Sequence, residues 1–219
     1  MMFDFAALSA SQRYALLASC IVPRPIAWVV SLDAEGRRNA APFSFFNMVC
    51  EDPPIVVLGI GAYPHGAKDS GANIRQAGEF VVNLVPERLL HAMHVTAIDF
   101  PPGTDELERA GLTVLPSTFV APPRIAECPV ALECRRHAMM EFAAGRSLVL
   151  GEVLATHVQD PLVLDAARPR LDSAAMGLIG RSYGPGGYVR ADGGPGGEGR
   201  IDQPRYTLAQ WQEGRLPER

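Results

Sequence analysis

The sequence predicts a mainly β protein, an antiparallel barrel or sandwich with a few short helices. Short apolar or alternating runs, each about the length of a strand, recur along the chain, and turn-forming residues separate them. The regular alternation of strands and long helices that builds a doubly wound parallel sheet is absent from the pattern. An antiparallel all-β architecture therefore accounts best for the sequence.

The N-terminal part of the chain contributes most of the expected strands. Two of them flank DAEG at 33–36, which is a natural four-residue hairpin turn. EDPP at 51–54 must interrupt a strand, because proline cannot donate to a sheet ladder. The expected strands in this part of the chain are 26–32, 37–42, 44–50, 55–61 and 79–85.

The C-terminal part predicts a second hairpin, in which AAGR joins strands at 129–142 and 147–160. Helices are fewer. A short helix at 72–78 should end on Gly78, and one at 86–97 begins with Pro86, which suits a first helical turn. A third helix is expected at 105–111.

Composition narrows the function classes. The 219 residues suit one large domain, or a domain with an appendage, and 47% hydrophobic content permits a sizeable core. The net charge is −4 and the cations are scattered, so no electrostatic footprint for nucleic acid is present. The N-terminal sequence lacks the features of a signal peptide, and no apolar run reaches the ~20 residues that a membrane helix needs.

The four cysteines, Cys20, Cys50, Cys128 and Cys134, form no C-x-x-C pair and have no matching histidine pair. This pattern predicts free thiols in a reducing compartment, so we expect a cytoplasmic protein without a zinc site. Cys128 and Cys134 are interpreted as core thiols.

The composition changes near residue 184. Residues 184–199 contain eight glycines and are expected to be mobile, because they cannot bury enough apolar surface to offset the entropy of ordering. We therefore expect a domain at 1–183 and a Gly/Pro-rich segment with a C-terminal tail at 184–219. Tyr206, Leu208 and Trp211 suggest that the tail docks, for example on a partner subunit.

Signatures of several enzyme classes are missing. GAYPHGAKDS at 61–70 resembles a phosphate loop, but Ala67 separates the glycine from Lys68 and breaks the G-K-[ST] register. No G-x-S-x-G or S-x-x-K occurs. His91 and His94 lie three apart on an expected helix without a third ligand, so a surface helix explains them better than a metal.

His137 and His157 fall on expected strands. There each is more readily a half-buried strand residue than a base.

The loop before the 72–78 helix contains groups that could bind an anion. The N–H groups at a helix N-terminus attract anions, Lys68 would add a positive charge and Ser70 a hydroxyl. The alternative is a solvated loop in which Asp69 or Ser70 caps the helix.

Three segments, at 22–31, 39–49 and 67–83, together resemble the flavin reductase-like family, which includes flavoredoxin-type proteins. They supply PRPIAWV, NAAPFSFFN, EDPP, KDSGANI and EFVVN in that order. The resemblance is dense over 14–85, thins over 86–128 and returns weakly at 151–160. Residues 180–188 resemble a degenerate C-terminal Gly-Arg…Tyr signature, and Ser70 stands where the family usually has threonine. The resemblance implies an antiparallel split β-barrel with a few short peripheral helices.

An FMN site is what these segments imply. An apolar, aromatic slot would hold the isoalloxazine. In a continuous strand Phe43 and Phe45 would point one way and Ser44 and Phe46 the other, with Pro42 disrupting the strand and freeing N–H groups. The expected cofactor-binding residues are Arg24, Ile26, Asn39, Ser44, Phe45, Phe46, Asn47, Lys68, Ser70, Asn73 and Arg181.

Within this set, Asn39, Ser44 and Asn47 suit the ribityl chain, whereas Lys68, Ser70 and Asn73 suit the phosphate. Arg24 and Arg181 are further cations. No catalytic residue is expected, because the hydride chemistry belongs to the cofactor.

The resemblance further implies a homodimer that carries FMN, or FAD, and takes a hydride from NADH or NADPH. The activity favoured is an NAD(P)H:flavin oxidoreductase, which could supply a separate monooxygenase or another electron acceptor. A flavoredoxin-like electron carrier, a non-catalytic flavin-binding protein and a pyridoxamine-phosphate-oxidase-like enzyme are the alternatives. The sequence does not distinguish NADH from NADPH.

Overall fold

The computed structural model describes residues 1–63, 66–101, 103–143, 145–182 and 187–191. Its centre is a seven-stranded sheet in which every neighbouring pair of strands is antiparallel. In spatial order the strands are β3 (Arg38–Phe43), β2 (Ala27–Leu32), β8 (Glu79–Leu84), β11 (Val130–Ala143), β12 (Arg146–Val158), β5 (Pro54–Ile60) and β4 (Phe46–Glu51).

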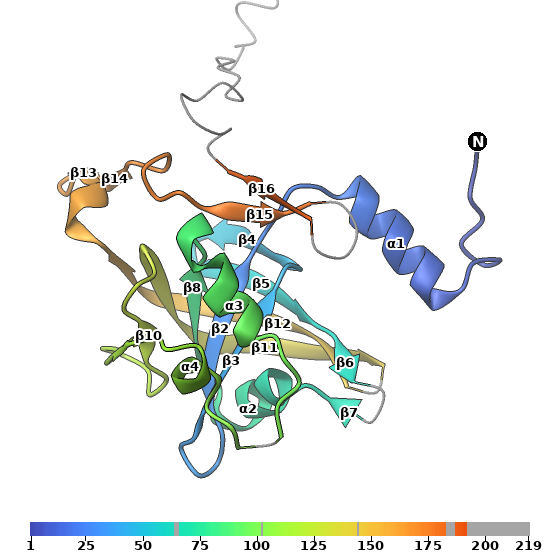
Figure 1. The fold of residues 1–219 in the computed structure, drawn as a ribbon, viewed down its shortest axis with the longest axis horizontal. Helices are drawn as coiled ribbons and strands as arrows, with labels where there is room; N and C mark the ends of the chain where they lie inside the picture. The colour runs from blue at the N-terminus through green and yellow to red at the C-terminus, as the bar shows by residue number, and fades with distance from the viewer. Residues whose placement is uncertain (64–65, 102, 144, 183–186, 192–219) are drawn as a thin grey trace, which may run out of the picture.

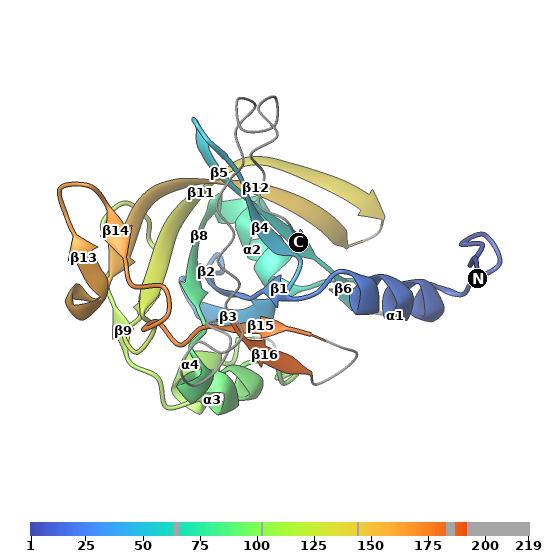
Figure 2. The ribbon, with the colours of Figure 1, turned by 90° about the horizontal axis from the view of Figure 1, so that it is seen from above.

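The sheet curls because its two outer strands, β3 and β4, are consecutive in the chain. Only Ser44 and Phe45 separate them, and the N–H of Gly59 on β5 donates a 2.7 Å hydrogen bond to the carbonyl of Phe45. Figures 1 and 2 show the strongly curved sheet, with the long β11–β12 hairpin along one side.

Smaller elements surround this sheet (Figure 1). The helices are α1 (Ala10–Cys20), α2 (Asp69–Ala77), α3 (Leu90–Val95) and α4 (Glu106–Arg109), with 3-10 turns η1 (Glu87–Leu89) and η2 (Asp160–Leu162). The short strands are β1 (Arg24–Pro25), β6 (Ala62–Tyr63), β7 (Gly66–Ala67), β9 (Val114–Leu115), β10 (Arg124–Ile125), β13 (Val163–Asp165), β14 (Arg170–Leu171), β15 (Ile179–Arg181) and β16 (Tyr188–Arg190).

Alternate side chains of β2 enter two different cores, which explains its uninterrupted apolar sequence. Ala27 and Val29 pack in the core that also receives Phe80, whereas Trp28 and Val30 pack beneath α3 and α4. The Trp28 indole N–H donates a 2.9 Å hydrogen bond to the Thr96 hydroxyl just after α3. This contact fixes the segment that forms one wall of the site described below.

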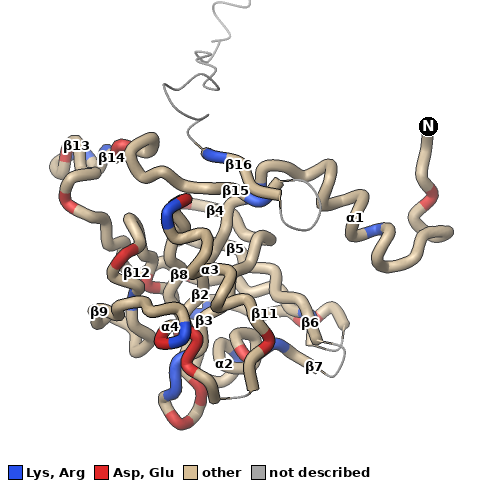
Figure 3. Tube along the Cα trace, in the orientation of Figure 1, with Lys and Arg blue, Asp and Glu red and all other residues tan. Residues whose placement is uncertain are grey.

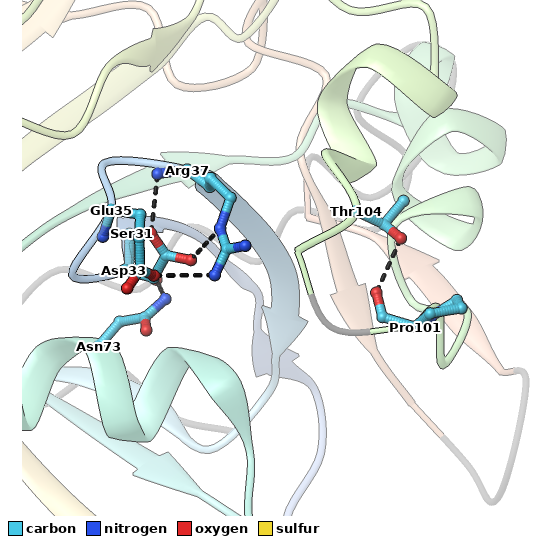
Figure 4. Close-up of polar contacts among 7 residues, drawn as sticks. All are labelled: Ser31, Asp33, Glu35, Arg37, Asn73, Pro101 and Thr104. Carbon is cyan, nitrogen blue, oxygen red and sulfur yellow. Dashed lines mark hydrogen bonds and ion pairs between the residues drawn. The ribbon is translucent and has the colours of Figure 1, made fainter.

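The predicted elements are largely confirmed. The 33–36 turn forms, and its Asp33 carboxylate accepts from the Arg37 side chain (Figure 4). The helix expected at 72–78 begins earlier, at Asp69, and is followed by Gly78 in the left-handed conformation (φ 74°), where glycine meets little steric hindrance. The helix expected at 86–97 is shorter, since η1 precedes α3, and α4 is shorter than 105–111.

Three expectations need correction. Residues 44–45 form a bend rather than continuing a strand, so Phe43 is buried while Phe45 is 52% exposed. Pro42 lies within β3 and pairs with Trp28, so the strand is interrupted two residues later than expected. Tyr188–Arg190, in the segment expected to be mobile, forms β16 and pairs with β15.

The remainder of the 184–219 segment, including Tyr206, Leu208 and Trp211, lies outside the described residues. No helix among the described residues is long and apolar enough to cross a membrane.

Helix α1 was not predicted. Ser9 caps it, and Ser9 and Gln12 form a reciprocal capping box. Figures 1 and 2 show the helix extending away from the barrel. Its Tyr14 and Leu17 are each 48% exposed, so the described residues leave its apolar side partly uncovered.

Candidate functional site

The candidate site is a pair of adjoining cavities beside the β3–β4 bend. The larger, about 280 Å³, lies between the bend, α3 and β15–β16. The smaller, about 60 Å³, lies between β3, the start of α2 and residues 96–100. Both are lined by Pro42 and Ala97, so they share one wall.

The larger cavity combines apolar walls with several polar side chains. Its lining residues are Tyr14, Ile26, Pro42, Phe43, Ser44, Met93, His94, Ala97, Arg181 and Tyr188. The Arg181 guanidinium lies over the Tyr188 ring, 4.8 Å from its centroid, and His94 meets the same ring edge-on at 5.5 Å. An apolar slot with a few fixed polar groups is the usual chemistry of a cofactor pocket.

The smaller cavity brings together three of the expected residues. The Asn39 side-chain amide on β3 donates a 2.8 Å hydrogen bond to the Ser70 hydroxyl on α2. Lys68, directly before α2, places its ammonium 4.8 Å from the centre of the Tyr63 ring. Lys68 is the N-cap residue and makes no side-chain capping bond, and neither Asp69 nor Ser70 caps the helix, so the capping alternative is wrong.

Carboxylates share this cavity with Lys68. Asp69, Asp99 and Glu106 all line it. Burial and the neighbouring Asp99, Asp69 and Glu106 raise the pKa of the Tyr63 hydroxyl to about 12. The pKa of Glu106 is raised as well, mainly by its burial, although the N–H of Ala40 donates to its Oε2 atom at 3.0 Å and partly opposes the shift.

Arg24 serves the structure of this region. It is buried, and its Nη1 atom donates 2.7 Å hydrogen bonds to the carbonyls of Ala18 and Ile21 at the end of α1. Its Nε atom lies 3.5 Å from the Ser44 hydroxyl, and β1 pairs it with Arg181. Arg24 therefore fixes α1 and the bend beside the larger cavity.

Four expected residues lie elsewhere. Phe46 and Asn47 line a separate apolar groove of about 650 Å³ that β4, β5 and β15 help to form, and Ile26 reaches both this groove and the larger cavity. Phe45 points to the surface beside Tyr14, with ring centres 6.4 Å apart. Asn73 donates to the buried Ser31 hydroxyl at 3.1 Å and thereby attaches α2 to β2 (Figure 4).

Several lining residues were not predicted. Tyr188 belongs to the Gly-Arg…Tyr signature at 180–188, which could have pointed to it. His94 was expected on a surface helix rather than at a metal site; it is exposed on α3 and also lines the larger cavity. Within the described residues no cluster of potential metal ligands occurs. Tyr14, Asp99 and Glu106 reach the site through tertiary packing, for which the sequence gives no local signal.

The two strand histidines and the two core cysteines singled out in the sequence do not line either cavity of the candidate site. His157 is half-buried on β12 and hydrogen-bonds the fully buried Glu133, whereas His137 is exposed, so it was wrongly expected to be half-buried. Cys128 and Cys134 are buried free thiols, as expected, and burial raises the pKa of both.

The donor set fits a flavin nucleotide. The apolar and aromatic walls of the larger cavity suit a flat ring, and Ser44 and Arg181 add polar groups there. Asn39, Lys68 and Ser70 offer an amide, a cation and a hydroxyl for a polar, anionic end.

Comparisons with known proteins bear on the family and the fold of the chain. The model of the flavin reductase like domain matches residues 18–170. The 2-nitrobenzoate 2-nitroreductase NbaA of Pseudomonas fluorescens is 33% identical, with a TM-score of 0.84 over 100% of this chain and 99% of that one. Component B of nitrilotriacetate monooxygenase from Bacillus cereus is 29% identical, with a TM-score of 0.81 over 87% of this chain and 95% of that one.

A Shewanella frigidimarina protein with a split barrel domain is 21% identical, with a TM-score of 0.78 over 94% of this chain and 100% of that one, which shows the fold. The fold is thus the expected antiparallel split barrel. With 18–170 matched by the family model, the chain belongs to the flavin reductase-like family.

Proposed function

We propose that the chain is an NAD(P)H:flavin oxidoreductase that binds FMN, or alternatively FAD, and catalyses hydride transfer from NADH or NADPH to the flavin. The observation that carries this proposal is the pair of adjoining cavities, one apolar with Ser44 and Arg181, the other polar with Lys68, in a chain of this family.

The residues have distinct tasks in this proposal. Ile26 and Phe43 form apolar walls for the ring, and Ser44 donates or accepts at its polar edge. Asn39, Ser70 and Lys68 face the ribityl and phosphate end. A bound flavin supplies the atom that accepts the hydride, so no acid or base from the protein is required.

We further propose a homodimer. Phe45, Met48 and Val49 are exposed around the bend and the outer strand β4, at 52%, 70% and 54%. Tyr14 and Leu17 extend the exposed apolar surface along α1. A large exposed apolar surface of this kind is typical of a protein interface.

A cellular role is suggested by the likeness to component B of nitrilotriacetate monooxygenase. We propose that the reduced flavin serves a partner monooxygenase or another acceptor, because component B of nitrilotriacetate monooxygenase spans nearly the same fold. The cysteines of the described residues are free thiols, which supports the cytoplasm as the compartment.

A second candidate is reduction of an aromatic nitro group. It is favoured by NbaA, a 2-nitrobenzoate 2-nitroreductase that this chain matches over its whole length. In this case the nitroaromatic compound, rather than free flavin, takes the electrons.

One assay tests both candidates. Consumption of NADH and of NADPH is followed by absorbance, first with the protein alone, then with added FMN, FAD or 2-nitrobenzoate. The reductase proposal predicts consumption that rises with free flavin and needs no nitro compound. If flavin-loaded protein consumes neither nucleotide, the reductase proposal is wrong. Turnover only with 2-nitrobenzoate would favour the second candidate.

A further inference from the structure

We propose that this site selects the flavin by its ring and ribityl chain and gains little from the phosphate, so that riboflavin and FMN bind with similar affinity. The inference rests on the proposed function and concerns the balance of charge around Lys68.

The charges lining the smaller cavity sum to a negative value. Among the described residues that line it, Lys68 is the single Lys or Arg, and it is opposed by Asp69, Asp99 and Glu106. Figure 3 shows acidic and basic positions close together between α2, α4 and β7. A phosphate placed here meets one cation, the N-terminus of α2 and three carboxylates, and repulsion by the carboxylates offsets the attraction.

Glu106 is fixed in place by the fold. Its Oε2 atom accepts the N–H of Ala40, the residue after Asn39 on β3, and α4 packs against that strand. Side-chain rotation therefore cannot carry this carboxylate away without losing the bond. The raised pKa values of Glu106 and Tyr63 arise partly from their acidic neighbours, which agrees with a negative potential in this cavity.

Lys68 also has other neighbours. Its ammonium lies 4.8 Å from the centre of the Tyr63 ring and 6.0 Å from that of Phe43, both within the range of cation–π attraction. A phosphate would compete with these contacts. Ser70, the second phosphate candidate, accepts from the Asn39 amide and keeps its hydroxyl hydrogen to donate. Such an uncharged contact adds less to phosphate affinity than a second cation would.

The larger cavity shows the opposite balance. Arg181 is the only charged group, leaving His94 aside, among its described lining residues, and the remaining walls are apolar apart from Ser44 and the Tyr14 and Tyr188 hydroxyls. Burial of the flavin ring in this cavity would supply affinity that riboflavin and FMN share.

The test is the ratio of two dissociation constants, measured by quenching of flavin fluorescence at one salt concentration. For the wild type we expect the dissociation constants of riboflavin and FMN to agree within about tenfold. An unopposed charge-assisted phosphate contact would instead make FMN bind about 10- to 100-fold more tightly than riboflavin. Lys68→Ala should weaken FMN binding about tenfold or more and riboflavin binding little. The reason is that the charged side chains left in the smaller cavity are then all carboxylates, which repel the phosphate of FMN.

Neutralising the carboxylates should act in the other direction. Glu106→Gln and Asp99→Asn should each tighten FMN binding about threefold and leave riboflavin binding unchanged. A threefold change is the size expected when one partly solvated charge is removed. Glu108→Gln is the matched control, since Glu108 lies on the same helix but is exposed and outside the cavity lining.

The outcomes separate the two proposals. FMN binding more than about tenfold tighter than riboflavin, the range of an effective charge-assisted phosphate contact, would overturn this inference but support the flavin site. Equal tightening of both flavins by Glu106→Gln would also overturn the inference, because the charge would then act on the ring or the fold. Saturable binding of neither flavin would overturn the proposed function itself.

Discussion

The backbone N–H of Gly59 donates a 2.7 Å hydrogen bond to the carbonyl of Phe45. This bond attaches the bend between β3 and β4 to β5 and holds Ser44 at the larger cavity. Gly59 is required by this close approach, because a Cβ atom there would lie 2.9 Å from the Cβ of Phe45.

Gly59→Ala is therefore expected to displace the bend. Since Ser44 moves with Phe45, the variant should lose flavin affinity by about tenfold, and its thermal midpoint should fall by a few degrees, as overpacking costs about 1–3 kcal/mol. Flavin titration and thermal unfolding measure the two effects. Gly61→Ala, where nothing lies within 4 Å of the added Cβ, is the control. Equal effects of the two substitutions would contradict this role of the bend.

Lys68→Ala should weaken FMN binding by about 1.5–3 kcal/mol, the contribution of a charge-assisted contact. Ser44→Ala should cost less, since at most one neutral hydrogen bond is lost. Isothermal titration at matched ionic strength gives both values. Unchanged FMN affinity in Lys68→Ala would return Lys68 to the role of a solvated loop residue.

Glu133 should make stability depend on acid pH. Its carboxylate is fully buried, and burial alone would raise its pKa. The backbone N–H groups of Thr118 and Phe119 donate to it, and it contacts His157. These contacts outweigh the burial, so the pKa of Glu133 is lowered below 4.5. A lowered carboxyl pKa contributes stability above the unfolded-state pKa, and that contribution is lost as pH falls through the folded-state pKa.

Glu133→Gln tests whether this carboxylate causes the acid dependence of stability. We expect it to lower the free energy of unfolding at pH 7 by about 2–3 kcal/mol, because an amide cannot accept from three donors as a carboxylate does. Urea unfolding from pH 7 to pH 3 should show a shallower acid loss of stability than in the wild type. The exposed Glu108→Gln serves as control. An acid dependence unchanged from the wild type would assign the loss to other carboxylates.

Met48→Lys should dissociate the proposed homodimer. Met48 is 70% exposed on the outer strand β4, and a buried lysine in an apolar interface is costly. Sedimentation velocity is expected to show a dimer for the wild type and a monomer for the variant. Leu164→Lys, at an exposed position on β13, should leave the dimer intact. A monomeric wild type would refute the homodimer.

Local patterns in the sequence were enough to predict most of the barrel. β2 and β8 were recognisable because both of their faces are buried, which produces continuous apolar runs. Gly78 marked the end of α2 because a left-handed residue follows the helix. The ordered motifs from 22 to 83 indicated the family, and Asn39, Lys68 and Ser70 indeed line one cavity.

Tertiary packing decided what the sequence could not reveal. The bend at 44–45 depends on Gly59, fourteen residues after Phe45, so the strand pattern of the phenylalanines was misleading. Glu106 enters the cavity only because α4 packs on β3. Helix α1 carried one local signal, the Ser9–Gln12 capping box, and little apolar periodicity, since the described residues bury only Ala18 of this helix.

Titration of the purified protein with FMN, followed by flavin fluorescence and by the absorbance of the bound chromophore, tests the flavin site most directly. We predict saturable binding with one FMN per chain, and a perturbed flavin spectrum because the ring enters the larger cavity. A protein that leaves the spectrum and fluorescence of added FMN unchanged would contradict the flavin site, and the reductase proposal would fall with it.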